Sequence, residues 1–121
     1  MKQQLYNYIN LKYLYNMSGG DNEFVVEMIS DYLSNEPKNF SFLMEALKNK
    51  NFADIAYHAH KLRSAAQIMG ANELLENLEC IENLALQNKC VEDEIGFKIE
   101  QINSKILTEL SEELQVINPR I

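Results

Sequence analysis

Apolar residues recur at intervals of three and four along most of this sequence, and that spacing leaves few folds open. The pattern is clearest in two stretches, made up of Phe52, Ile55, Ala59, Leu62, Ala66 and Met69 in the first and Ile95, Ile99, Ile102, Ile106, Leu110 and Leu114 in the second. Such intervals place side chains on one face of an α-helix. The sequence therefore predicts amphipathic helices that each bury one face.

Turn-forming and capping residues divide the chain into about six helical segments. A short helix around residues 11–17 is expected to end at the glycines that begin with Gly19. Asp21 is a good N-cap for the second helix. Pro37 suits the first turn of a third helix, which would run to about Asn49.

The second half of the chain predicts three longer helices. One covers about residues 52–69 and is closed by Gly70. Asn72 is expected to cap the next helix, and the last helix runs from about residue 92 to 117, where Pro119 stops it. Short connections between amphipathic helices imply antiparallel neighbours. We therefore expect an all-α fold, an up-and-down antiparallel four-helix bundle with one or two additional short N-terminal helices, as a single domain over residues 1–121.

Composition and charge exclude several classes of function. The formal net charge is -7, and no stripe of Lys and Arg suggests binding to nucleic acid or to an anionic membrane. No apolar run approaches the roughly 20 residues that span a bilayer, and no segment near the start resembles a signal peptide. Cys80 and Cys90 lack metal-ligand spacing. These features favour a cytoplasmic protein that acts on a protein partner.

His60 lies on the side of the 52–69 helix that faces away from the core. At about 100° per residue, its side chain points roughly 140° from the middle of the apolar stripe. Its neighbours on that surface include Tyr57, Arg63 and Ser64, with Gln67 one turn further on. The pattern predicts an exposed histidine beside one cation, with nothing packed against it.

The second histidine, His58, occupies a different position on the same helix. It lies two residues from His60, about 200° around the axis, so the two cannot bind one metal ion together. It lies about 60° from the apolar stripe, which predicts half-burial at a helix–helix boundary and a structural role. Neither histidine has Glu three residues before it, as the Glu-x-x-His motif of metal-binding bundles requires.

An exposed imidazole leaves two interpretations open. It can be a surface residue without a function. It can also be a nucleophile, because a neutral imidazole offers a nitrogen lone pair that attacks phosphorus and carries a phosphoryl group covalently. Arg63, one turn away, could stabilise that group through charge-assisted hydrogen bonds.

The residues around His60 resemble the signature of histidine phosphotransfer (HPt) domains. The stretch HKLRSAA, which starts at His60 and is followed by Gly70, Ala71 and Leu74, is similar to the family pattern. That pattern has an acceptor His, an apolar residue two positions on, Lys at three, a small residue at four and Gly at ten. The upstream stretch SGGDNEFVVEMISDYLSNEPKNFSFLMEAL is also similar, and the resemblance extends from about Leu11 to the final helix.

The resemblance implies a role for each matching residue. His60 would be phosphorylated, Arg63 would stabilise the phosphoryl group, and Ser64 would be the small residue that gives a partner access. Gln67 lies within reach as a polar contact. Two positions depart from the usual family residues, since Arg63 stands in place of Lys and Ser64 in place of Gly. Transfer rates and partner choice depend on both departures.

The resemblance also implies a mechanism and partners. A response-regulator receiver domain would pass its aspartyl phosphoryl group to His60, and a second receiver would take it. The receiver would supply Mg²⁺, so this chain would need no cofactor of its own and no kinase or ATPase activity. A hybrid sensor histidine kinase would stand upstream, and the protein itself would be a monomer. The alternative is a helical interaction or scaffold module, such as a degenerate HPt-like domain that binds receivers without phosphotransfer.

Overall fold

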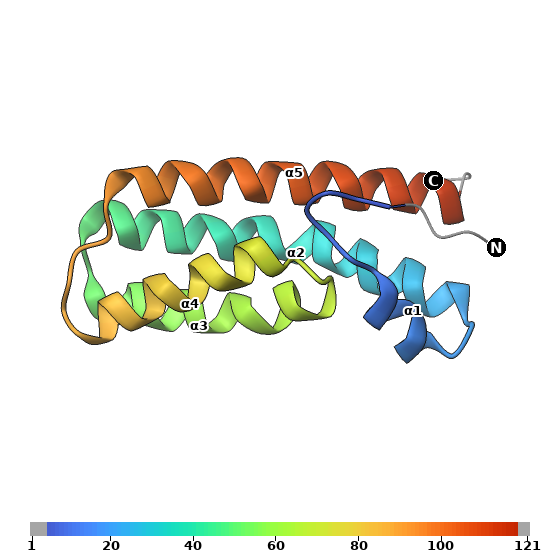
Figure 1. Ribbon diagram of the computed structural model, residues 1–121, viewed down its shortest axis with the longest axis horizontal. Helices are drawn as coiled ribbons and strands as arrows, with labels where there is room; N and C mark the ends of the chain where they lie inside the picture. The colour runs from blue at the N-terminus through green and yellow to red at the C-terminus, as the bar shows by residue number, and fades with distance from the viewer. Residues whose placement is uncertain (1–4, 119–121) are drawn as a thin grey trace.

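The computed structural model describes residues 5–118, and within that range the chain forms five α-helices (Figure 1). Their bounds are α1 Lys12–Ser18, α2 Asn22–Asn49, α3 Phe52–Ile68, α4 Asn72–Leu86 and α5 Asp93–Ile117. The expected all-α class is confirmed. No helix within the described range combines the length and the apolar character needed to cross a membrane.

Helices α2 to α5 form an antiparallel four-helix bundle. Helix α3 packs against α2 and α4, and α5 packs against the same two helices, so α3 and α5 occupy opposite corners. Helix α1 packs on the N-terminal part of α2, outside the bundle. This is the expected architecture, with one additional short helix rather than two.

The predicted apolar stripes form the core. On α3 and at its C-cap, Ile55, Ala59, Leu62, Ala66 and Met69 are buried. The apolar residues of α4, which are Leu74, Leu78, Ile81 and Ala85, are buried with them, as are five of the six predicted on α5. Burial of these stripes leaves the opposite faces of the helices in water. The face of α3 that carries His60 is therefore solvent-exposed, as the spacing predicted.

The prediction that a third helix starts at Pro37 is wrong, because α2 runs through this residue without a break. Proline has no amide hydrogen, so it costs the helix one backbone hydrogen bond. The buried side chains continue in phase on both sides of it, with Ile29 and Tyr32 before and Phe40 and Leu43 after. Their packing against one core keeps the segment helical despite the missing bond.

The predicted cap at Asn72 is also wrong. Asn72 is the first residue of α4, and the N-cap position belongs to Ala71, whose side chain makes no capping hydrogen bond. Ala71 is fully buried, and its backbone N–H donates to the carbonyl of Ala66. Packing of the tight α3–α4 turn therefore decides where the helix begins. Pro119, the predicted stop of the last helix, lies outside the described residues.

The segment before α1 lies along the C-terminal part of α5, an arrangement that the sequence did not predict. The Glu109 carboxylate accepts hydrogen bonds from three consecutive backbone amides, those of Asn7, Tyr8 and Ile9, at 2.8 to 3.2 Å. One turn later, the buried Glu113 carboxylate accepts hydrogen bonds from two tyrosine hydroxyls. Two glutamates on one helix thus hold the N-terminal segment in place.

Candidate functional site

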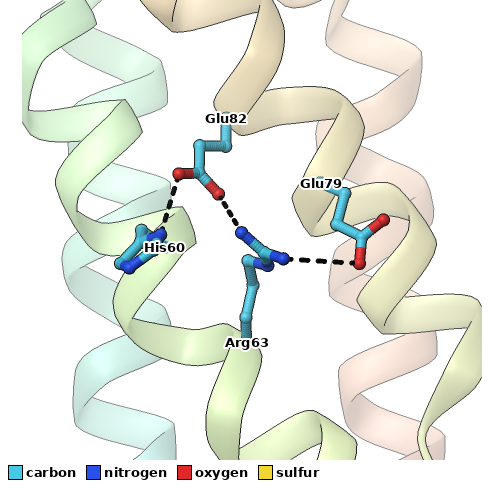
Figure 2. Close-up of polar contacts among 4 residues, drawn as sticks. All are labelled: His60, Arg63, Glu79 and Glu82. Atoms are coloured by element: carbon cyan, nitrogen blue, oxygen red, sulfur yellow. Dashed lines mark hydrogen bonds and ion pairs between the residues drawn. The ribbon is translucent and has the colours of Figure 1, made fainter.

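The α3–α4 hairpin places two residues of α3, His60 and Arg63, opposite two glutamates of α4. His60 precedes Ala71 by eleven residues, and Glu82 follows it by eleven. Arg63 and Glu79 are each eight residues from Ala71. In an antiparallel pair joined by a tight turn, residues at equal distances from the turn lie opposite one another. Figure 2 shows the resulting cluster of four side chains.

The imidazole of His60 is hydrogen-bonded on one side and open on the other. Its Nδ1 lies 2.8 Å from Oε2 of Glu82, while 69% of the His60 side chain is exposed. An ionised carboxylate only accepts hydrogen bonds, so Nδ1 carries the hydrogen. In the neutral ring, Nε2 then has the free lone pair.

The expectation that nothing packs against His60 is wrong, because Glu82 contacts it from α4. Helical spacing relates His60 only to residues on its own helix, whereas Glu82 lies on the next one. The equal spacing of His60 and Glu82 from the turn was a signal that could have identified this carboxylate. Glu82 also follows the buried Ile81 directly, which places it at the edge of the α4 apolar stripe, and only 13% of its side chain is exposed.

Arg63 is held by the same carboxylate and by a second one. Its Nη1 donates to Oε1 of Glu82 at 3.0 Å, and Nη2 lies 3.7 Å from Oε1 of Glu79. Glu82 therefore bridges His60 and Arg63, one oxygen to each (Figure 2). The guanidinium lies beside the imidazole, as predicted, but it is already paired with two negative charges.

Ser64 and Gln67 are both exposed on α3, as their positions predicted. Neither of these described residues makes a hydrogen bond to His60. Gln67 instead lies at the edge of a groove that it shares with Asn10, Lys12 and other residues at the N-terminal end of the chain. The four predicted residues thus share one surface, but only His60 and Arg63 are connected through a common partner.

His58 is half-buried at the boundary of α2 and α3, as predicted. Its ring centroid lies 5.6 Å from that of Phe42 on α2 and 5.0 Å from that of Tyr57, which it meets edge-on. Tyr57 is itself 61% exposed. His58 packs between aromatic rings, and its surroundings differ from the polar cluster around His60.

Glu36 lies on the α2 side of the same region. It lines a small groove with Ala65 and Ile68 of α3. Burial raises the pKa of the Glu36 carboxyl, and a hydrogen bond with Asn39 and the charge of Lys61 act against this rise. The Glu36 carboxyl therefore binds its proton more tightly than a fully exposed glutamate does.

The site is an exposed imidazole on a helical bundle, hydrogen-bonded through Nδ1 to Glu82 and accompanied by the guanidinium of Arg63. No group of three or more His, Cys, Asp or Glu residues within 5–118 is arranged to hold a metal ion. The family model for the Hpt domain matches residues 27–117, about three quarters of the chain. The chain belongs to the Hpt domain family.

Hpt domains are histidine phosphotransfer modules of phosphorelays, and they interact with receiver domains. The matched range leaves out α1 and the segment before it. Comparisons with curated proteins and with solved structures give no match to the chain.

Proposed function

We propose that His60 accepts a phosphoryl group from the aspartyl phosphate of a receiver domain and passes it to a second receiver. The observation that carries this proposal is the hydrogen bond between Nδ1 of His60 and Glu82. It leaves Nε2 as the nucleophilic nitrogen, on a side chain that is mostly exposed to an approaching partner.

The transfer step follows from this arrangement. The Nε2 lone pair attacks phosphorus and forms a P–N bond, while the bond between phosphorus and the aspartyl oxygen breaks and leaves a carboxylate. The phosphorylated ring carries a positive charge and keeps its hydrogen on Nδ1. Glu82 accepts the hydrogen bond from Nδ1 and compensates the positive charge of the ring without taking its proton. When a second receiver takes the phosphoryl group, the P–N bond breaks and its electron pair returns to Nε2. No proton therefore has to leave the ring in either transfer.

The other residues of the surface support this step. Arg63 shares the Glu82 carboxylate with His60, and we assign it to the phosphoryl oxygens. Ser64 has a short side chain one turn from His60, which leaves room for a receiver to approach within roughly 3–3.5 Å of Nε2. Gln67 would contact the partner further along the helix. The receiver supplies Mg²⁺, and phosphoryl transfer then depends on positioning and charge.

Two matched variants test the assignment. Wild type, His60→Gln and His58→Gln are incubated with a receiver domain that carries a labelled aspartyl phosphate. The wild type and His58→Gln are expected to gain an acid-labile label, and His60→Gln is expected to gain none. The two variants are directly comparable because both replace a histidine of the same helix by glutamine. Circular dichroism of each variant provides the control for folding.

Label on folded His60→Gln would refute the assignment of the acceptor. Binding of the receiver without label on the wild type would favour the alternative, a module that binds receivers without phosphotransfer.

A further inference from the structure

The charges around Arg63 are unfavourable for a phosphoryl group on His60. Arg63 contributes one positive charge, and Glu79 and Glu82 contribute one negative charge each. The cluster is therefore already negative before a phosphoryl group adds about two more negative charges. A phosphoryl group on Nε2 has to compete with carboxylates for the only cation of this cluster.

The two carboxylates differ in how they can affect this competition. Glu82 also holds the imidazole, and it compensates the positive ring of phosphohistidine. Glu79 contacts Arg63 alone, through the longer 3.7 Å pair, and 47% of its side chain is exposed. Replacement of Glu79 therefore changes the competition for Arg63 and leaves the orientation of His60 intact.

The guanidinium is also incompletely satisfied in this arrangement. Its Nε is buried and has no hydrogen-bond partner. A buried donor without an acceptor is destabilising. A phosphoryl group offers three acceptor oxygens, so a shift of Arg63 toward it would provide partners that the two carboxylates do not.

We propose that Glu79 raises the phosphoryl-transfer potential of phospho-His60 by competing with the phosphoryl group for Arg63. This inference rests on the proposed function. It assigns to Glu79 the role of a tuning residue, which makes His60 a ready phosphoryl donor to the next receiver. Glu79 does not touch the reacting atoms, and it acts through Arg63.

The test uses phosphoramidate, a small donor that requires no receiver. Nε2 attacks its phosphorus, the P–N bond to the amine breaks, and ammonia leaves. With fixed phosphoramidate and ammonium concentrations the reaction reaches a plateau, and ³¹P NMR gives the ratio of phosphorylated to free His60. The Glu79→Gln variant is expected to raise this ratio roughly two- to fivefold, the range of an exposed ion pair. Glu100→Gln, the same charge change at an exposed site on α5, should leave it unchanged.

A second pair of variants tests whether Glu79 acts through Arg63. The pair is Arg63→Ala alone and Arg63→Ala combined with Glu79→Gln. The ratio of phosphorylated to free His60 should be nearly the same in these two proteins. An equal ratio for the wild type and Glu79→Gln would overturn the inference, as would an effect of the same size in the Arg63→Ala background. If no variant with an intact His60 becomes phosphorylated, the proposed function fails and this inference fails with it. Phosphorylated wild type with an unchanged ratio in Glu79→Gln contradicts the inference alone.

Discussion

At the scale of single residues, the site depends on a carboxylate that lies 22 positions from the histidine in the sequence. Glu82 selects the nitrogen of His60 that carries the hydrogen, and it also fixes Arg63. His60 and Arg63 were predicted from the helical spacing around them. Glu82 was missed because its role depends on how two helices pair.

Replacement of Glu82 by Ala is expected to slow the phosphorylation of His60 by phosphoramidate roughly tenfold, the effect of losing a hydrogen bond to a charged group. Without the carboxylate, Nδ1 and Nε2 share the ring hydrogen between two tautomers, and the positive ring of the product loses its partner. The initial rate of phosphohistidine formation measures the effect. Glu76→Ala, at an exposed position on the same helix, is the matched control. Equal rates for the wild type and Glu82→Ala would show that the hydrogen bond has no influence on the nucleophile.

At the scale of the elements, the turn between α3 and α4 sets the register of the site. Gly70 adopts a left-handed conformation with φ of 62°. A Cβ at this position would lie 2.1 Å from the carbonyl oxygen of Asn10, in the segment that crosses the turn. The amide of Asn10 also donates to the carbonyl of Met69 at 3.1 Å. The glycine therefore serves both the turn and the close approach of the N-terminal segment.

The Gly70→Ala substitution should destabilise the protein by more than about 1 kcal/mol, because it adds a steric clash with backbone to an unfavourable φ. The Gly96→Ala substitution is the control, since Gly96 lies inside α5 and a Cβ there meets no atom within 4 Å. It should stabilise the protein by about 0.5–1 kcal/mol through helix propensity. Urea unfolding of both variants measures the two free energies. Similar changes in both would contradict the account of the turn.

The bounds of a helix were predictable from the sequence where the apolar spacing and the capping residues indicate the same end points. The α3 and α5 bounds follow from their stripes and from Gly70, whereas the break predicted at Pro37 does not occur. Between the buried residues Tyr32 and Phe40 of α2, the position that would continue the apolar face holds a charged residue, Glu36. A proline beside a charged residue resembles a helix boundary, although the buried positions on either side remain in phase.

At the scale of the whole molecule, the N-terminal segment and α1 are attached to α5 by one tyrosine each, through a buried carboxylate. The hydroxyls of Tyr6 and Tyr15 donate to Glu113, which is 4% exposed. Burial raises the pKa of both phenols, and the hydrogen bonds to Glu113 raise it further. Burial also raises the pKa of Tyr32 in the core. The folded protein thus holds these phenol protons more tightly than the unfolded chain does.

This difference predicts a loss of stability in alkaline solution. A group whose pKa is raised by folding contributes its stability fully below the unfolded pKa, here about 10, and loses it as the pH rises further. The free energy of unfolding should therefore fall as the pH rises above about 10. Tyr15→Phe should make that decline shallower, whereas Tyr13→Phe, at an exposed position on the same helix, should not. Identical slopes for the two variants in urea unfolding across this range would contradict the prediction.

The attachment of the N-terminal segment was not predictable from the sequence, for a physical reason. Glu109 and Glu113 follow Ile106 and Leu110 by three residues, so they lie beside the apolar stripe of α5, and nothing near them in the sequence identifies their partners. Their burial and hydrogen bonds depend on a segment that lies about 100 residues earlier in the chain. The fold class and the exposed histidine needed only local periodicity, whereas these contacts arise from tertiary packing.

An NMR measurement on the His60 imidazole in ¹⁵N-labelled protein tests most directly which nitrogen accepts the phosphoryl group. Before phosphorylation, the ring should carry its hydrogen on Nδ1, the nitrogen bonded to Glu82. After reaction with phosphoramidate, coupling between ³¹P and ¹⁵N should appear at Nε2 of His60. Phosphorus bonded to Nδ1 of His60 or to His58, or no bonded phosphorus on the folded protein, would contradict the assignment.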